Sequence, residues 1–292
     1  MNKIKMFWRY NFMNSKSAFT LAEVLITLGV IGVVAAVTLP TLIKNYQKHA
    51  WTNSLKGNYS LLNQGFQKMM ADEGLEFIYD TEAFKSIGEY ENHGMKFKSC
   101  SSNDDINSNL CKDFYNNLKY YFKIVSIGKI NNYSYKYLNG INSYVINSNI
   151  ITLSNGATIL NYSFGSSSST NSRCQIIHSA GGHTCTQQGH FYIDINGKKG
   201  PNIYGRDIFY FYVNEKGNIM PYGGNDYAIF QASYFDNTIT PENIEKNRAN
   251  GQSSSNKCDK NLSGSIVENY PNYNGNGCAG YLIDELNWKM DY

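Results

Sequence analysis

The sequence lacks the short motifs that mark common catalytic sites. It has no Gly-x-Ser-x-Gly nucleophile motif, no His-Glu-x-x-His zinc motif and no phosphate-binding loop ending in Gly-Lys-Ser or Gly-Lys-Thr. Each of these motifs supplies something that its reaction needs: an exposed nucleophile, a metal with its general base, or a cradle for phosphates. Their absence argues against these enzyme classes, and we expect no enzymatic activity.

A net basic charge is missing once the first 18 residues are set aside. The whole chain has 26 Lys and Arg against 23 Asp and Glu, a formal net charge of +3. Residues 1–18 contain four basic residues and no acid, so the remainder has 22 basic and 23 acidic side chains, a sum of −1. The total charge therefore gives no argument for nucleic acid or acidic lipid as a partner.

A long apolar run follows this basic start. From Phe19 to Leu39 the only charged residue is Glu23. As a helix, this run spans about 32 Å, close to the ~30 Å hydrocarbon thickness of a bilayer. The preceding basic residues favour a cytoplasmic N-terminus and an extracytoplasmic C-terminal bulk.

Three interpretations of this run compete. The first is a secretory signal peptide cut after Ala35-Ala36. Such peptides usually have an apolar core shorter than this run, and an acid inside that core is atypical. A plain membrane anchor accounts for the apolar length but gives no reason for Glu23. The third interpretation accounts for Glu23 as well, and it depends on the residues that surround the run.

The segment Ser17-Ala-Phe-Thr-Leu-Ala-Glu23, with its apolar run and Pro40, resembles the N-terminus of type IV pilins and type II secretion pseudopilins. In that family the leader peptidase cuts before a Phe, whose amine is then methylated, and the mature chain has Glu at position 5 and Pro at position 22. Counted from Phe19, Glu23 and Pro40 occupy these positions. The resemblance implies cleavage between Ala18 and Phe19 and N-methylation of Phe19. The family usually has Gly where this chain has Ala18, so we expect slower processing.

The resemblance implies a filament subunit, a pseudopilin or minor pilin of a type II secretion system or type IV pilus. Its partners would be a prepilin peptidase, other pilin subunits, the inner membrane and an assembly platform, with no nucleic acid. The chain would lie in the inner membrane with its head in the periplasm, or at the cell surface after assembly. The carboxylate of Glu23 would pair with the Phe19 amine of a neighbouring subunit; the alternative is an unpaired Glu23 at the membrane interface. A pilus-delivered adhesin and a competence pilin are the alternative functions.

The rest of the chain predicts an α+β, pilin-like fold, in which a long N-terminal membrane-spanning helix packs on an antiparallel β-sheet head with disulfide-stapled loops. Apolar residues recur every three or four positions from Leu55 to Met70, so we expect one helix from about Thr20 to Glu73. We divide the chain into a leader (1–18), a membrane or filament-core helix (19–39), its amphipathic continuation (40–73) and a globular head (74–292).

The β-sheet signals are strongest after residue 149. Ile150–Leu153 and Thr158–Phe164 flank an Asn-Gly turn, and alternating residues predict strands over His190–Ile195 and Asp207–Val213 with one face buried. Weaker strand predictions are Phe77–Tyr79, Tyr120–Val125, Tyr144–Ile146 and Trp288–Tyr292. A short helix is expected over Asp113–Tyr121, a helical turn or two from Cys278, and a polar surface loop over 242–262.

All six cysteines lie beyond the apolar run, on the side expected to be oxidising. Fifteen pairings are possible in principle. The intervals favour three local disulfides, Cys100–Cys111, Cys174–Cys185 and Cys258–Cys278. A zinc site made of Cys174, Cys185 and the nearby histidines 178, 183 and 190 is the alternative, but its spacing fits no common zinc module.

Two further features bear on ligands. Asp194, Asn196 and Asp207 could hold Ca²⁺, but they lack the full acidic series of a calcium loop, and a hairpin turn is the simpler interpretation. We expect no other cofactor. The 24 tyrosines could form a sugar-binding or surface-binding face, although tyrosine more often decorates sheets.

Overall fold

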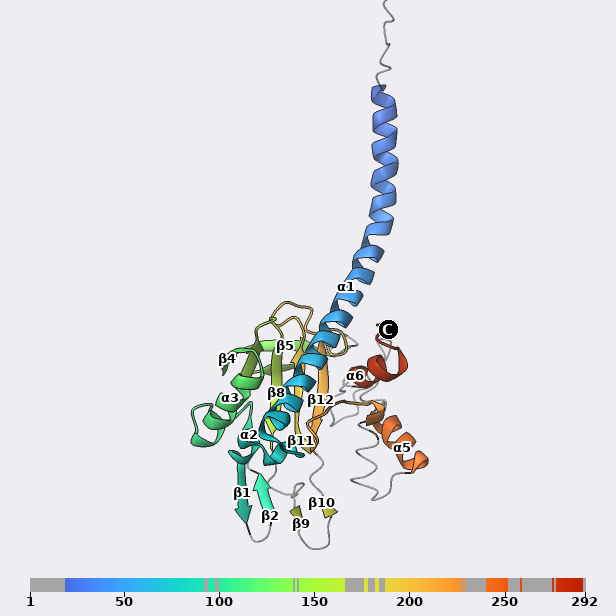
Figure 1. The fold of residues 1–292 in the computed structure, drawn as a ribbon. Helices are drawn as coiled ribbons and strands as arrows, with labels where there is room; N and C mark the ends of the chain where they lie inside the picture. The colour runs from blue at the N-terminus through green and yellow to red at the C-terminus, as the bar shows by residue number, and fades with distance from the viewer. Residues whose placement is uncertain are drawn as a thin grey trace, which may run out of the picture. The chain divides into compact units, whose positions relative to one another are not determined.

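The computed structural model describes residues 19–91, 94–97, 100–138, 140, 142–165, 176–177, 182–183, 187–226, 228, 240–251, 258, 275 and 277–290. The chain divides into two compact units, Met1–Gln47 and Lys48–Tyr292. We call the second unit the head from here on; it contains residues 48–73 of the long helix as well as the globular head (74–292) expected from the sequence. The observed elements are α-helices and antiparallel β-strands, which confirms the predicted α+β, pilin-like class (Figure 1).

The longest element is helix α1, Leu21–Glu73, which has 53 residues and contains Pro40. It begins and ends within one residue of the helix predicted from the apolar spacing. Within the described residues, α1 is the one helix long and apolar enough to cross a membrane, with a mean hydropathy of 2.3 over its most apolar 18-residue window. The residues of that window are not buried in the protein.

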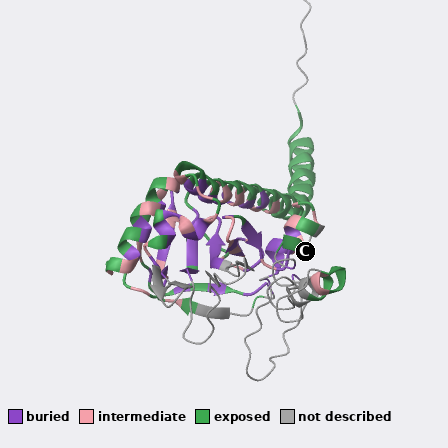
Figure 2. Ribbon diagram, turned by 60° about the horizontal axis from the view of Figure 1, so that its bottom comes forward, coloured by how far each residue is buried: buried purple, intermediate pink, exposed green. Residues whose placement is uncertain are grey.

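The C-terminal part of α1 belongs to the head. Its buried residues recur at intervals of three or four, so they lie along one side of the helix. They are Thr52, Leu55, Asn58, Leu62, Gly65, Phe66, Met69 and Met70. The amphipathic stripe seen in the sequence is therefore the surface by which this part of α1 packs on the sheet (Figure 2).

The central antiparallel sheet has seven strands. Along the sheet their order is β13-β12-β11-β8-β7-β4, and β3 pairs with the end of β8 beyond β7. The strands are β3 (Cys100–Ser101), β4 (Ile124–Lys129), β7 (Asn149–Leu153), β8 (Thr158–Phe164), β11 (Gln187–Asp194), β12 (Ile208–Asn214) and β13 (Ile219–Pro221). The predicted hairpin between β7 and β8 is present, with Gly156 at a φ of 88° in its turn.

Shorter elements surround the sheet. The helices are η1 (Ile78–Asp80), α2 (Glu82–Lys85), α3 (Asn109–Tyr121), α5 (Pro241–Gly251), α6 (Cys278–Gly280) and the π-helix η2 (Tyr281–Glu285). In the described part of the chain, three separate two-stranded pairs are β1 (Gly88–Glu91) with β2 (Gly94–Phe97), β5 (Tyr133–Lys136) with β6 (Asn142–Ile146), and β9 (Ile176–Ile177) with β10 (Gly182–His183).

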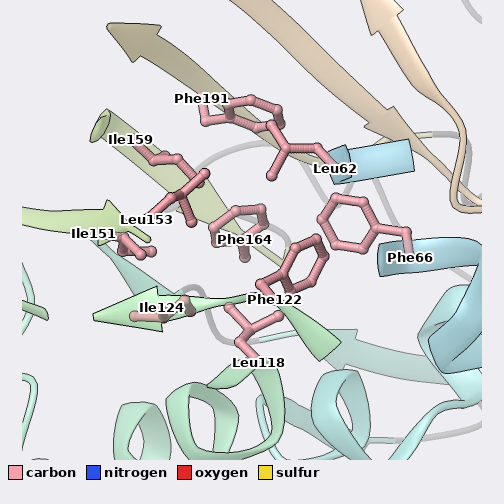
Figure 3. Close-up of a pocket in the computed structure, with 10 residues that line it drawn as sticks. All are labelled: Leu62, Phe66, Leu118, Phe122, Ile124, Ile151, Leu153, Ile159, Phe164 and Phe191. Carbon is pink, nitrogen blue, oxygen red and sulfur yellow. The ribbon is translucent and has the colours of Figure 1, made fainter. Parts of the chain in front are cut away.

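One apolar core fills the space between α1, α3 and the sheet. Figure 3 shows its centre, a small pocket lined only by aliphatic and aromatic side chains. The lining residues are Leu62, Phe66, Leu118, Phe122, Ile124, Ile151, Leu153, Ile159, Phe164 and Phe191. Phe66 and Phe122 meet edge to face with ring centroids 4.9 Å apart, a favourable aromatic geometry.

The opposite face of the sheet is also covered, so the expectation of one buried face was incomplete. Tyr133, Tyr135 and Tyr137, in and next to β5, form a second apolar cluster with Tyr192 of β11 and Tyr204. Tyr192 stacks on Tyr210 with centroids 4.2 Å apart. The sheet is therefore the middle layer of the head.

Several weaker predictions were wrong. Phe77–Tyr79 is not a strand, because Ile78–Asp80 forms a 3-10 turn. Helix α3 extends through Tyr121, so the strand predicted over Tyr120–Val125 begins only at Ile124. The predicted loop over 242–262 begins instead as helix α5. Residues 288–290 form no strand. In the segments predicted as strands the apolar pattern was too short to separate strand from helix or turn, and the polar residues of α5 carry no apolar repeat that predicts a helix.

Among the described residues of the head, two disulfides are present. Cys100 is bonded to Cys111, which joins β3 to α3, and Cys258 is bonded to Cys278 at the start of α6. Both pairings are among the three favoured by the sequence intervals. Cys174 and Cys185 lie outside the described residues.

Candidate functional sites

The first candidate site is the N-terminal segment, where α1 begins. Thr20 precedes the first helical residue and Glu23 is the third residue of the helix. The Thr20 backbone N–H and the Thr20 hydroxyl each donate to Glu23 Oε2 at 2.8 Å, and the Glu23 backbone N–H donates to Thr20 Oγ1 at 3.2 Å. This reciprocal arrangement is a capping box, which satisfies backbone donors at the helix N-terminus.

Sequence reasoning missed this local role of Glu23, although its signal was present. Thr-Leu-Ala-Glu, before an apolar run, is the Ser/Thr-x-x-Glu pattern of a capping box. The carboxylate also lies beside the positive end of the helix dipole. Glu23 therefore has a function within its own chain, and pairing with a neighbour's Phe19 amine stays a prediction.

The rest of this segment exposes apolar side chains. Phe19 is 84% exposed, and exposed leucines, isoleucines and valines follow along α1 through Ile43. A continuous apolar surface of this kind marks a membrane or a partner surface. Pro40 lies inside the helix and is exposed. Ala18, on the other side of the predicted cleavage point, lies outside the described residues.

The second candidate site is the connection between β11 and β12, which we call the Asp194 turn (residues 194–207). Asp194 ends β11 and is fully buried. Its Oδ1 accepts a hydrogen bond from the Asn196 N–H at 3.0 Å, and its Oδ2 accepts one from the hydroxyl of Tyr133 in β5. Asp194 therefore joins the turn to β5.

Asp207 closes the other end of the same turn. It is also fully buried, and it accepts hydrogen bonds from the N–H groups of Asn202 at 2.8 Å and Ile203 at 2.6 Å. Asn196 Nδ2 lies 3.4 Å from Asp207 Oδ2, so the three residues predicted as calcium ligands do come together. In this structure Asp207 holds backbone N–H groups of the turn with both carboxylate oxygens, whereas Asp194 does so with Oδ1 and accepts from Tyr133 with Oδ2.

Burial changes the acidity of this pair. Removal from water raises the pKa of Asp194 to about 7, although the hydrogen bonds from Tyr133 and from the backbone oppose the change. Burial likewise raises the pKa of Asp207. No ion pair to either aspartate occurs among the described residues. The described donors to both aspartates are neutral. A buried carboxyl pair without a positive partner favours keeping a proton over carrying two negative charges.

The structure describes some of the residues predicted as calcium and zinc ligands. In the described part of the chain, no group of three or more His, Cys, Asp or Glu side chains could hold a metal ion. Asn196 and Asn202 each have a buried side-chain oxygen without a hydrogen-bond partner, so calcium at the Asp194 turn stays a prediction. Of the proposed zinc ligands, His190 lies in β11 between the rings of Tyr210 and Tyr212. Cys174, His178 and Cys185 lie outside the described residues.

Comparison with known proteins bears on the first site. Residues 13–39 match the family described as the Prokaryotic N-terminal methylation motif. This is the prepilin-type cleavage and methylation segment of type IV pilin-like proteins, and the match confirms the resemblance seen in the sequence. No curated protein and no solved structure matches the chain. The motif supports a structural subunit of the pilin-like or pseudopilin type, and it implies a prepilin peptidase and other pilin subunits as partners.

Proposed function

We propose that this protein is a subunit of a type II secretion pseudopilus or a type IV pilus, present as a pseudopilin or minor pilin. The observation that carries the proposal is the coincidence of the methylation motif, at residues 13–39, with the exposed apolar part of helix α1. A peptidase would cut between Ala18 and Phe19, and the new amine of Phe19 would be methylated. No catalytic step is required of the head.

Before assembly, the apolar part of α1 would hold the chain in the inner membrane. Four basic residues and no acid precede Phe19, which favours a cytoplasmic N-terminus. The head would then lie in the periplasm. This side also suits the Cys100–Cys111 and Cys258–Cys278 disulfides, since disulfides persist in oxidising compartments.

During assembly, the carboxylate of Glu23 would meet the positive amine of a neighbouring Phe19. Both charges are costly in an apolar filament core unless they are paired, so the pair favours one stagger between subunits. The capping box contributes to this role, because Thr20 holds the carboxylate at the start of the helix.

Variants separate the pairing role from the capping role. Glu23→Gln keeps a side-chain oxygen that can accept from Thr20 but removes the charge, whereas Thr20→Ala removes the hydroxyl and keeps the charge. Loss of a cap costs about 1 kcal/mol of helix stability. We expect both variants to insert in the membrane, Glu23→Gln to be excluded from filaments, and Thr20→Ala to assemble.

Filament assembly is measured by sedimentation of sheared filaments and by cross-linking between subunits. Normal incorporation of Glu23→Gln would overturn the pairing role. N-terminal mass spectrometry of the membrane fraction tests processing independently. A chain starting at methylated Phe19 is expected, and a chain starting at Val37 would instead indicate an ordinary secreted protein.

A further inference from the structure

The near-zero charge of the mature chain conceals an uneven distribution. There is no Asp or Glu between Glu23 and Asp72, and none between Asp113 and Asp194. By contrast, the last residues of α1 and the segment after it carry five acids within eleven residues. These are Asp72, Glu73, Glu76, Asp80 and Glu82. The fold decides where these unequal segments lie.

Tertiary contacts bring basic residues from the acid-poor segments to one end of the head. Ser54 Oγ donates to the Ile195 carbonyl at 2.9 Å, so the Asp194 turn lies beside the first residues of α1 that belong to the head. The N–H of Lys136 in β5 donates to the Asn202 carbonyl at 2.8 Å, and the N–H of Tyr204 donates back to the Lys136 carbonyl at 3.0 Å. Strand β5 is thereby attached to the same turn.

We define the basic end of the head as these residues: Lys136, Lys198, Lys199 and Arg206. The three lysines are exposed and Arg206 is partly exposed. None of the four forms an ion pair with a described residue. The acids of the same turn, Asp194 and Asp207, are fully buried and hydrogen-bonded to the turn itself. The exposed charge of the Asp194 turn and Lys136 is therefore positive.

The opposite end of the head has the acids. Glu73 accepts a hydrogen bond from the Glu82 N–H, and Glu76 pairs with Lys216 in the turn between β12 and β13. That turn and the Asp194 turn lie at opposite ends of β12 (Figure 1). The acids of residues 72–82 and the four basic residues defined above therefore lie toward opposite ends of β12, although Lys68 and Lys216 accompany the acids; the basic group is the one beside Ser54 of α1.

Chain connectivity limits the distance between the apolar run and the first residue of the head. Nine residues lead from Leu39, the end of the apolar run, to Lys48, the first residue of the head. Even fully extended, they reach only about 30 Å. The basic end contacts α1 at Ser54, six residues after Lys48, so it is tethered to the apolar run, and a tethered surface meets nearby headgroups at high effective concentration. Basic residues near an anionic bilayer gain about 1 kcal/mol each, which is about fivefold in binding.

We propose that the basic end of the head binds the anionic lipid headgroups of the membrane in which the chain is anchored. Lys136, Lys198, Lys199 and Arg206 would hold the unassembled subunit against the bilayer surface. The proposal rests on the membrane anchoring proposed above. Release of this contact would accompany extraction of the subunit into a filament.

The experiment uses the full chain in lipid nanodiscs with one copy per disc. One set of discs is neutral phosphatidylcholine, and the other contains phosphatidylglycerol. The acetylation rate of each lysine by an amine-reactive ester is measured by mass spectrometry, with Lys216 as the reference at the other end. We expect Lys198, Lys199 and Lys136 to react about fivefold more slowly in the anionic discs at low salt. High salt should remove the difference, because it screens exposed charges.

Two double variants make the test specific. Lys198→Glu with Lys199→Glu should abolish the protection of Lys136 by anionic lipid. Lys85→Glu with Lys112→Glu makes the same charge change on exposed residues of α2 and α3, and it should leave that protection intact.

The outcomes are distinguishable. Failure of the full chain to enter discs would contradict the membrane anchoring itself. Equal acetylation rates in neutral and anionic discs would overturn the lipid contact while leaving the anchoring in place. A third result is protection that is independent of lipid charge and appears only when several copies share a disc. It would assign the basic end to contact with a second subunit, and it would likewise overturn the lipid proposal.

Discussion

Gly65 tests whether the C-terminal part of α1 is an integral part of the head. A Cβ atom at this position would lie 2.2 Å from Cε1 of Phe122 and 2.7 Å from Cδ1 and Cζ of the same ring. Carbon atoms in contact are normally 3.5–4.0 Å apart, so the ring must move by about 1 Å or more. Phe122 is 4% exposed and packs against Phe66, which leaves it little room to move.

The variant Gly65→Ala is therefore expected to destabilise the head by overpacking, which costs about 1–3 kcal/mol. Alanine also improves helix propensity by about 1 kcal/mol, which partly offsets that cost. Gly57→Ala is the matched control, because Gly57 lies on the exposed side of the same helix with nothing within 4 Å of its added Cβ. Both variants gain the same propensity, so the difference between them isolates the overpacking at about 1–3 kcal/mol.

The free energy of unfolding is measured by denaturant titration of the full chain in detergent, at constant m-value. We expect Gly57→Ala to be at least as stable as the parent chain and Gly65→Ala to be less stable than Gly57→Ala. Equal stability of the two variants, within about 0.5 kcal/mol, would refute the close packing of α1 on Phe122.

Three other predictions concern the head. Its stability should fall as the pH rises from about 4 to about 7, because folded Asp194 retains a proton that the unfolded chain releases near a pKa of 3.8. The difference between the two pKa values corresponds to at most about 4 kcal/mol of unfolding free energy. In denaturant titrations at several pH values, Asp194→Asn should flatten this pH dependence. Replacing Cys100 and Cys111 together by Ser should lower the unfolding free energy by about 3 kcal/mol, since the disulfide closes an 11-residue interval; an unchanged thermal midpoint would contradict this. Calcium and chelator should give the same thermal midpoint, because backbone N–H groups already occupy Asp194 and Asp207; a rise with calcium that chelator reverses would establish a metal site.

Much of the fold followed from local patterns. The apolar spacing predicted α1 to within a residue at each end, and the Asn-Gly turn predicted the β7–β8 hairpin. These signals are strong because each arises from one continuous segment. Phe77–Tyr79 and the residues of α5 carried no such repeat, so neighbouring contacts decided their conformation.

Some features of the candidate sites could likewise be predicted from the sequence, and others could not. Ala18, Phe19, Glu23 and Pro40 were identified by counting along the chain. The match at residues 13–39 confirms the methylation motif, which includes the first three; Pro40 lies just beyond it, and the roles of all four residues stay predictions. The capping role of Glu23 was readable from Thr20 but was overlooked. The contact between Asp194 and Tyr133 was not readable, because the two residues are 61 positions apart.

The sequence by itself determined the apolar run and the processing motif, because those depend on residue order and on the length of one segment. It also determined a nearly neutral total charge. Only the tertiary structure decided where that charge lies, because folding buries Asp194 and Asp207 and attaches β5 to their turn. The charge of a surface depends on which side chains the fold leaves in water, and a sum over the sequence does not contain that information.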